Sequence, residues 1–295
     1  MLPEDWHLTQ DVDDFLAQAG DFLCSRTAIH NTPLTDIEKL RIHRAADHDA
    51  EAAVFGRLES QGEVRAIFYL TPRRRLVLTP LSVEHTNTLA AHLADLGHSP
   101  ANVIADHDTA STFAESWQQH TGAASVLFWR THLYRLGTLT PPQPRPEGQG
   151  RLTDGKDRDQ IMRWCREFCI DVGEQHSIDL IDAGSWEDSR FGDRHFTFWE
   201  TPEGTPVSMA ASTSAVGGMV RVDPVYTPAH LRGRGYAGAV TVEASRAAQA
   251  AGATDVVLFT DPDNPTSNAL YQRIGYVHVA DFAGYKFSYG APEAG

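Results

Sequence analysis

The sequence predicts a mixed α/β fold made of two similar halves. Apolar residues recur at helical spacing in some segments and form strand-like runs in others, so helices are expected between strands. Four prolines and two glycines fall within residues 138–150, a composition that ends both helices and central strands. The order of expected elements is similar on the two sides of this segment. A chain of 295 residues also suits about two domains.

The first half, residues 1–140, is expected to mix helices with strands. Apolar spacing predicts helices over residues 11–24, 35–46, 85–96 and 109–120. Runs of apolar residues predict strands over residues 52–58, 64–70, 76–81 and 124–136, with a short strand between the last two helices. The first three of these strands follow one another closely, which favours a meander.

Residues 141–150 are expected to be a linker or a long crossing loop, because proline and glycine favour extended or turning backbone. The second half, residues 151–295, has a similar mixture of elements. Helices are predicted over residues 157–169, 178–191, 236–251 and 265–274, of which 178–191 has the least regular pattern. Strands are predicted over residues 195–200, 207–212, 218–226, 255–260 and 277–287.

The formal net charge of −14 is shared by both halves rather than gathered in a tail. Nucleic-acid binding needs a basic face, so such a partner is not expected, whereas attraction of cationic molecules is compatible with this charge. No apolar run is long enough to cross a membrane. The N-terminus lacks the basic and apolar regions of a signal peptide, so a cytoplasmic protein is expected.

Three cysteines do not make a disulfide framework. Cys165 and Cys169 stand four residues apart on a predicted helix, beside Trp164 and Phe168. A redox or metal-binding pair is one interpretation, but two buried thiols on an apolar helix face fit better. The histidines form no H-E-x-x-H pattern, so no metal is expected.

The most informative segment runs from the strand at 218–226 through a turn into a helix. The turn has the sequence R-G-R-G-Y-A over residues 232–237. Gly233 and Gly235 leave backbone N–H groups open to a ligand, and a helix N-terminus attracts anions, so the turn suits a pyrophosphate. Arg232 and Arg234 add positive charge for a further phosphate.

Two other glycine-rich phosphate loops fit this segment less well. Gly233, Gly235 and Gly238 have the G-x-G-x-x-G spacing of a dinucleotide-binding fold, but they follow a long strand and loop rather than a tight turn. The Walker pattern G-x-x-x-x-G-K-[ST] is absent. An ordinary surface loop is the remaining alternative.

A second segment, residues 258–276, reads as strand, turn, short helix and strand. Asn264 is a good N-cap, Pro265 suits the first helical turn, and Gly275 suits the position after the helix. Helix grammar does not explain Asn268 and Tyr271, which lie three residues apart on one face. They are either functional groups or a surface pair.

Together the two segments resemble the GNAT acyltransferase superfamily. The pattern is Arg232-x-x-Gly235-x-Ala237 at the start of a helix, followed after the next strand by Asn264-x-x-Ser267-x-x-x-Tyr271-x-x-x-Gly275-Tyr276. The resemblance covers about residues 150–287. The phrases V-Y-T-P and N-P-T-S-N-x-x-Y are similar to a two-part bacterial subgroup with a tandem GNAT-like fold. The first half has neither motif and resembles a degenerate copy, so one acetyl-CoA site is expected, in the second half.

The resemblance implies that acetyl-CoA is the co-substrate and that the strand at 218–226 splays from its neighbour. Pro224 agrees with an opening there, because it lacks an N–H. An N–H of this strand would polarise the thioester carbonyl. Tyr271 matches the family's general acid, which protonates the leaving thiolate. The implied acetyl-CoA-binding residues are Val225, Tyr226, Thr227, Arg232, Gly233, Arg234, Gly235, Tyr236, Ala237, Asn264, Ser267, Asn268 and Tyr271.

The acceptor amine must lose a proton before it attacks, because an amine of pKa about 10.4 is almost fully protonated at pH 7. Candidate bases are Asp223, Glu200 and Glu174, and for each a solvated carboxylate is an equal alternative. Glu174 is also a candidate for binding a cationic substrate. His230 precedes the phosphate loop and is interpreted as a loop residue rather than a base.

The resemblance implies an acetyl-CoA-dependent N-acetyltransferase that acts on a primary amine. A small amine, cationic molecules included, is the first expectation. A protein acetyltransferase for lysine or an N-terminus would need an open groove, and a non-catalytic acyl-CoA-binding regulator would need neither Asn268 nor Tyr271. A monomer or homodimer without nucleic-acid or membrane partners is expected.

Overall fold

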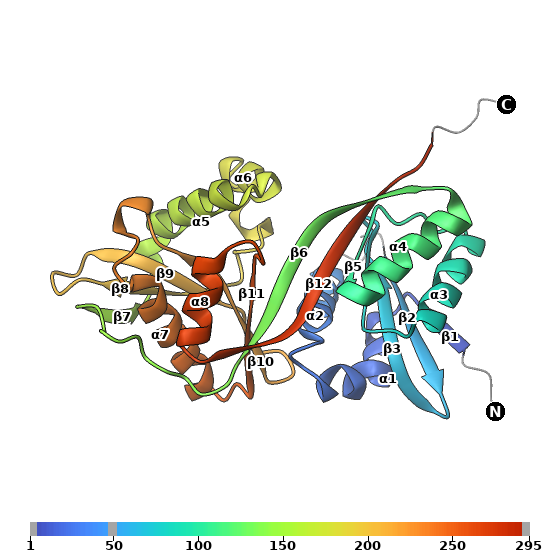
Figure 1. Cartoon of the computed structure of the whole chain (residues 1–295), viewed down its shortest axis with the longest axis horizontal. Helices are drawn as coiled ribbons and strands as arrows, with labels where there is room; N and C mark the ends of the chain where they lie inside the picture. The colour runs from blue at the N-terminus through green and yellow to red at the C-terminus, as the bar shows by residue number, and fades with distance from the viewer. Residues whose placement is uncertain (1–4, 47–51, 291–295) are drawn as a thin grey trace. The chain divides into compact units, whose positions relative to one another are not determined.

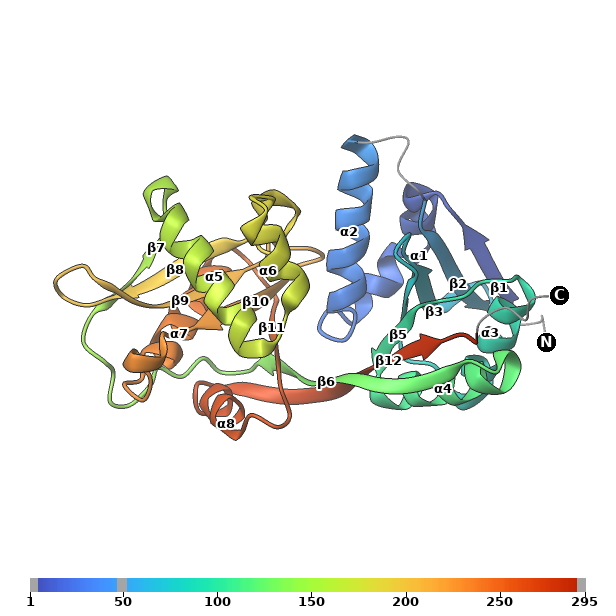
Figure 2. The ribbon, with the colours of Figure 1, turned by 90° about the horizontal axis from the view of Figure 1, so that it is seen from above.

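The computed structural model describes residues 5–46 and 52–290, which fall into two compact units. The first unit comprises the chain up to Leu133 and again from Val279, and the second comprises Tyr134–His278. The chain passes from one unit to the other within strand β6 (Ala124–Leu136) and returns within strand β12 (Tyr276–Ser288), as Figures 1 and 2 show. The expected linker at 141–150 therefore lies inside the second unit, and the C-terminal strand belongs mainly to the first.

The first unit is a mixed sheet with helices. Its sheet has the strand order β1-β2-β3-β4-β5-β12-β6. Strands β1 to β4 pair with their neighbours in antiparallel orientation, whereas β4 and β5 are parallel. Phe68, Phe113 and Trp117 lie in its largest buried cluster. Its elements besides β6 and β12 are β1 (Asp5–Thr9), α1 (Val12–Ser25), α2 (Asn31–Ala46), β2 (Val54–Ser60), β3 (Glu63–Leu70), β4 (Arg75–Leu78), α3 (Val83–Asp95), β5 (Asn102–Asp106) and α4 (His107–Thr121).

The second unit contains a sheet with the order β6-β11-β10-β9-β8-β7. Strands β7 to β10 are antiparallel neighbours, whereas β10 and β11 are parallel. Its elements are β7 (Gln149–Leu152), α5 (Arg158–Val172), α6 (Gln175–Asp182), β8 (His195–Glu200), β9 (Pro206–Ser212), β10 (Met219–Tyr226), α7 (Tyr236–Ala250), β11 (Asp255–Thr260) and α8 (Pro265–Arg273).

Helices cover both faces of the second sheet because its strands are apolar on both sides. Adjacent residues of β8 show this: Phe198 packs in a cluster with α5 and α6, whereas Trp199 packs in a cluster with α7. Successive strand residues point to opposite faces, so each strand contributes to two cores. Figure 1 shows α5 and α7 on opposite sides of β8 and β9. The predicted mixed α/β class is confirmed. No helix among residues 5–46 and 52–290 has the length and apolarity needed to span a bilayer.

The structure corrects the predicted helix over residues 178–191. Helix α6 ends at Asp182, and Gly184 follows with a left-handed φ of +76°. Such a glycine terminates a helix, so the chain turns through the short 3-10 helix Trp186–Asp188 and a loop to β8. The short strands β1 and β7 also went unpredicted, because five and four residues carry little pattern.

The proline-rich segment folds back on the second unit instead of linking two bodies. We call residues 137–150 the strap. Gly137 and Thr140 donate N–H bonds to the carbonyls of Gly275 and Ile274 at 2.9 and 3.0 Å. Farther along, the indole N–H of Trp199 donates to the Glu147 carbonyl at 3.0 Å.

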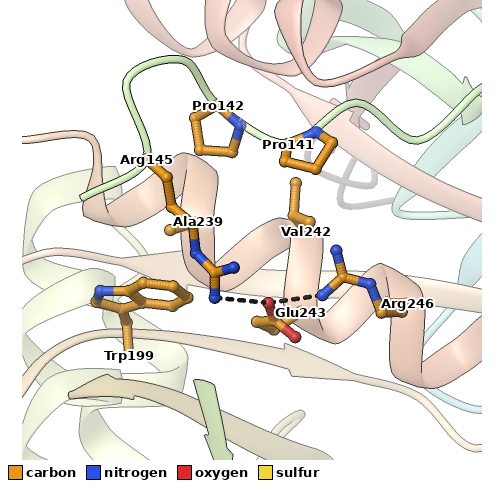
Figure 3. Close-up of a pocket in the computed structure, with 8 residues that line it drawn as sticks. All are labelled: Pro141, Pro142, Arg145, Trp199, Ala239, Val242, Glu243 and Arg246. Carbon is orange, nitrogen blue, oxygen red and sulfur yellow. Dashed lines mark hydrogen bonds and ion pairs between the residues drawn. The ribbon is translucent and has the colours of Figure 1, made fainter. Parts of the chain in front are cut away.

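The middle of the strap lies against α7. In Figure 3, Pro141 and Pro142 stand over the helix, and Arg145 reaches between Trp199 and Glu243. The Arg145 guanidinium lies 5.3 Å from the Trp199 ring centroid and 3.8 Å from the Glu243 carboxylate. The strap therefore contacts both the middle of α7 and the residues that follow α8.

Replacement of Gly275 by alanine is expected to destabilise the second unit by about 3 kcal/mol. An added Cβ would stand 1.8 Å from the Thr138 carbonyl oxygen, and the φ of Gly275 is +102°. Gly252→Ala is the matched control, because Gly252 also has a positive φ but nothing lies within 4 Å of its Cβ position. Urea denaturation measures both variants. Equal losses would show that the strap contact contributes nothing.

Candidate functional site

Strands β10 and β11 separate part-way along their length. Their parallel pairing covers only three residues of each, Met219–Arg221 against Asp255–Val257, although β10 continues to Tyr226 and β11 to Thr260. On its other edge β10 stays paired with β9 as far as Tyr226, with an irregularity between Val222 and Val225. The edge of β10 that faces β11 therefore has no strand partner over its last residues, within the described chain. This loss of pairing just before Pro224 is the separation that was predicted for the strand.

The glycine turn after β10 presents unpaired backbone N–H groups. Gly233 and Gly235 have φ values of +77° and +82°, which favour glycine. Helix α7 begins at Tyr236 without a side-chain cap, and its first hydrogen bond runs from the Ala239 N–H to the Gly235 carbonyl at 3.1 Å. Among the described residues, no acceptor meets the N–H groups from Gly233 to Gly238. Together with the helix dipole they form an anion site.

The two arginines of this turn have different surroundings. Arg232 donates to the Thr227 carbonyl at 2.9 Å and to Asp171 on α5, and its guanidinium lies 5.9 Å from the Tyr226 ring centroid. Arg232 therefore ties the turn to α5. Arg234 donates at 3.4 Å to the His230 carbonyl, so its charge stays near the turn without a carboxylate partner in the described structure.

Helix α8 begins as predicted. The Asn264 side chain accepts the Ser267 N–H at 3.0 Å, and Pro265 occupies the first turn. The Asn268 amide group donates to the carbonyls of Asp261 and Asn264 at 3.0 and 2.9 Å, and its oxygen accepts from the Thr260 hydroxyl. Asn268 thus builds the turn between β11 and α8.

Tyr271 lies three residues farther along α8 and is half-buried. Its ring meets Tyr276 edge-on, with the centroids 6.1 Å apart. Its hydroxyl makes no hydrogen bond to any residue that the structure describes. Burial, with smaller contributions from Tyr276 and the negative charge of Asp223, raises the pKa of Tyr271 above its ordinary value. The Tyr271 hydroxyl therefore keeps its proton and is open to a ligand.

Two predicted carboxylates meet at one arginine. The Arg190 guanidinium donates to Asp223 on β10 at 3.0 Å and lies 3.1 Å from Glu174, which precedes α6. Its carbon stands 4.8 and 5.6 Å from the ring centroids of Phe191 and Phe168. Burial opposes the charge of Arg190, but Asp223 and Glu174 outweigh it and raise the arginine's pKa. The structure therefore joins Asp223 and Glu174 beside the opening of β10.

Glu200, the third predicted carboxylate, lies elsewhere. It is buried at the end of β8, where it accepts from Arg151 at 2.8 Å. Arg151 also forms two bonds with Asp157, and these bonds lower the pKa of Asp157. Glu200 therefore belongs to an ion-pair network that joins β7, β8 and the start of α5.

Sequence reasoning missed three charged residues near the opening. Arg190 lies at the end of the segment predicted as helix and Arg194 lies just after that segment, and their convergence on Asp223 was not predicted. Glu167 on α5 accepts the Tyr226 hydroxyl at 2.8 Å. Burial, followed by this bond, raises the pKa of Tyr226 to about 12. The sequence signal for this cluster is the pair Arg190 and Arg194 on either side of Phe191, between α6 and β8.

Comparison with known proteins finds a family whose model matches most of the second unit. Residues 158–276 match the model of the Acetyltransferase (GNAT) family. No curated protein matches the sequence. The fold is similar to a GCN5-related N-acetyltransferase from Sphaerobacter thermophilus, with 18% identity, 99% of this chain and 98% of that chain covered, and a TM-score of 0.54.

Two further solved structures match almost the whole chain. An acetyltransferase from the GNAT family of Colwellia psychrerythraea is 9% identical, with 97% and 100% covered and a TM-score of 0.55. A tandem GNAT protein from the clavulanic acid biosynthesis pathway is 12% identical, with 98% and 100% covered and a TM-score of 0.53. At these identities the likeness concerns the fold, and it agrees with a two-part architecture.

Proposed function

Given that residues 158–276 form a GNAT-family acetyltransferase domain, we propose that this chain is an acetyl-CoA-dependent N-acetyltransferase acting on the primary amine of a small molecule. The observation that supports this most is that three features suited to acetyl-CoA occur in the same unit. The opening between β10 and β11, the uncapped N–H groups of residues 233–238 and the unbonded hydroxyl of Tyr271 lie on successive elements of it.

Acetyl-CoA fits these elements by chemistry. The pyrophosphate would accept from the N–H groups of Gly233 to Gly238, with Arg234 nearby for charge. The pantetheine arm would follow the unpaired edge of β10, along the backbone of Val225, Tyr226 and Thr227. Asn264, Ser267 and Asn268 would act mainly by shaping the turn that carries Tyr271.

The reaction is a direct transfer. The amine nitrogen forms a bond with the acetyl carbonyl carbon, the carbon–sulfur bond breaks, and the electron pair leaves on sulfur. Tyr271 donates its proton to that sulfur and regains one from solvent. Removal from water disfavours both the thiolate and the tyrosinate. The pKa of the leaving thiol therefore rises along with that of Tyr271, and the two values stay close enough for proton transfer.

The attacking amine needs a proton acceptor. Asp223 is our choice, because it lies on β10 where the pairing with β11 ends and its charge acts on Tyr271. Glu174 shares Arg190 with Asp223 and would orient the acceptor. Glu200 stays a prediction without support, since it lies on β8, which β9 separates from β10 in the sheet.

Thiol release from acetyl-CoA tests the proposal, with acetyl-CoA binding measured in parallel. The acceptor panel holds polyamines, aminoglycosides, amino acids and lysine peptides. Release with a small amine is expected. Release only with peptides would favour a protein acetyltransferase, binding without any release would favour a regulator, and absence of binding would contradict all three.

Gly235→Val is expected to raise the Kd for acetyl-CoA about tenfold or more. Valine avoids a φ of +82°, at a cost of about 1–2 kcal/mol, so the turn would rotate its N–H groups away from the anion site. Gly204→Val is the control, since Gly204 has a φ of +81° in the turn between β8 and β9. Calorimetric titration with acetyl-CoA decides. If both variants bound acetyl-CoA with the same Kd, the glycine turn would not be part of the acetyl-CoA site.

A further inference from the structure

Arg194 is a buried guanidinium with unsatisfied N–H groups. It lies in the loop before β8, and its side chain is only 2% exposed. Its Nε and Nη1 atoms have no hydrogen-bond partner in the described part of the chain. Nη1 lies 3.7 Å from Asp193 and Nη2 lies 4.0 Å from Asp223, beyond hydrogen-bond distance in both cases. Buried charges without hydrogen bonds are costly and rare, so Arg194 calls for an anionic partner.

Arg190 brings a second guanidinium to the same carboxylate. Its Nη1 and Nη2 atoms lie 3.0 and 3.5 Å from the two oxygens of Asp223, and its side chain is 34% exposed. Its Nε atom lies 3.1 Å from Glu174 but makes no hydrogen bond there. A ligand can thus reach Arg190 from solvent, whereas Arg194 lies buried beside the same carboxylate, Asp223.

We name Glu174, Arg190, Arg194 and Asp223 the acceptor charge cluster. It contains two positive and two negative side chains and is balanced before substrate binds. Asp193, the other carboxylate near Arg194, is half exposed, so water screens its charge. A cluster without net charge gives a polyamine no net electrostatic attraction.

Proton transfer disturbs this balance. When Asp223 takes the proton of an ammonium group, its negative charge is lost and both arginines lose the carboxylate that they share. Arg190 retains Glu174, but among the described residues Arg194 retains only the half-exposed Asp193 as a nearby carboxylate. An acceptor that carries its own carboxylate restores the lost charge, and a guanidinium binds a carboxylate through paired N–H groups.

We propose that the acceptor is an amino-acid-type zwitterion, with its amine at Asp223 and its carboxylate held by Arg190 and Arg194. This inference rests on the proposed function and narrows its substrate class. The acidic net charge of the whole chain favoured cationic amines, but the charges beside the opening of β10 favour a molecule bearing both signs.

Matched acceptors test the proposal. Leucine, phenylalanine and glutamate are each compared with the corresponding α-amide and decarboxylated amine in the thiol-release assay. We expect kcat/KM to be about 10- to 100-fold higher for at least one acid than for its two matched partners. Amides or simple amines that react as well as or better than the acids would overturn the inference while leaving the acetyltransferase intact.

Variants locate the preference. Arg190→Lys and Arg194→Lys keep the charge but lose the paired N–H geometry, and Arg194→Met removes the charge at similar length. The acid-to-amide ratio of kcat/KM should fall toward one in these variants. Arg166→Gln is the control, because Arg166 pairs with Asp182 on the exposed side of α5 and α6 and should leave the ratio unchanged. A ratio that survives in every folded arginine variant would contradict the assignment.

Failure of the proposed acetyltransferase function can be distinguished from failure of the zwitterion proposal. Absence of acetyl-CoA binding, or of thiol release with every acceptor, would contradict the acetyltransferase itself. In the second case, calorimetry of the same acid and amide pairs with the CoA-bound protein decides the inference alone. Tighter binding of the acid supports the charge cluster as a zwitterion site, and equal or absent binding overturns it.

Discussion

Tyr271→Phe is expected to lower kcat by about 10²- to 10⁴-fold, the range that general acids contribute. The change removes one hydroxyl, which makes no hydrogen bond within the described structure, so stability and acetyl-CoA affinity should hardly change. The ring and its edge-on contact with Tyr276 remain. Steady-state kinetics with a saturating acceptor measure the loss, and calorimetry with acetyl-CoA shows that the site is intact.

A neighbouring tyrosine gives the control. The Tyr134 hydroxyl accepts from Gln272 on the same helix α8 at 3.1 Å, so Tyr134→Phe removes a hydroxyl that touches α8 without being placed in the reaction. Its kcat should stay within a few-fold of the wild type. If Tyr271→Phe retained half of the wild-type kcat, Tyr271 would not be the acid that protonates the thiolate.

Asp223→Asn is expected to lower kcat/KM at pH 7 by about 10²- to 10⁴-fold. Asparagine keeps an oxygen for Arg190 but cannot accept the ammonium proton. The variant then depends on the neutral amine in solution, which is about one molecule in 2,500 at pH 7 for an amine of pKa about 10.4. Its kcat/KM should rise about tenfold per pH unit below that pKa, while the wild type should change less.

Glu200→Gln distinguishes Glu200 from Asp223 as the base. In our account Glu200 stabilises the network of Arg151 and Asp157, so the variant should lose stability but retain most of its kcat/KM and the wild-type pH profile. A steep pH dependence in Glu200→Gln together with a wild-type profile in Asp223→Asn would reverse the assignment.

Local patterns in the sequence were enough to predict several strands and helix ends of the second unit. The expected strands at 195–200 and 255–260 coincide with β8 and β11, because each is a short apolar run between turns. Asn264 caps α8 as predicted, and Gly235 precedes α7 with the positive φ that its position requires. These features depend on residues close in sequence, so a single chain contains the information.

Sequence patterns did not predict which charged residues, far apart in the chain, form ion pairs with one another. Asp223, Glu174 and Glu200 looked alike as candidate bases, but Arg190 joins the first two while Arg151 engages the third. Each of these pairs bridges separate elements, and its geometry follows from how α5, α6 and the loop before β8 pack on the sheet. Sequence spacing does not encode that packing.

Asn268 shows a related limit. Its place in the family motif predicts contact with acetyl-CoA, which stays a prediction, and in the structure its amide group donates to the carbonyls of Asp261 and Asn264. The same residue type at the same spacing serves either purpose. Only coordinates distinguish a side chain that shapes a turn from one that meets a ligand.

A crystal structure with bound acetyl-CoA tests the central claim most directly. We expect the pyrophosphate on the N–H groups of residues 233–238 and the pantetheine arm along β10 beyond Arg221, where its pairing with β11 ends. The thioester sulfur should lie within hydrogen-bond reach of the Tyr271 hydroxyl. A complex in which β10 and β11 close on each other, or in which the sulfur lies away from Tyr271, would contradict the account.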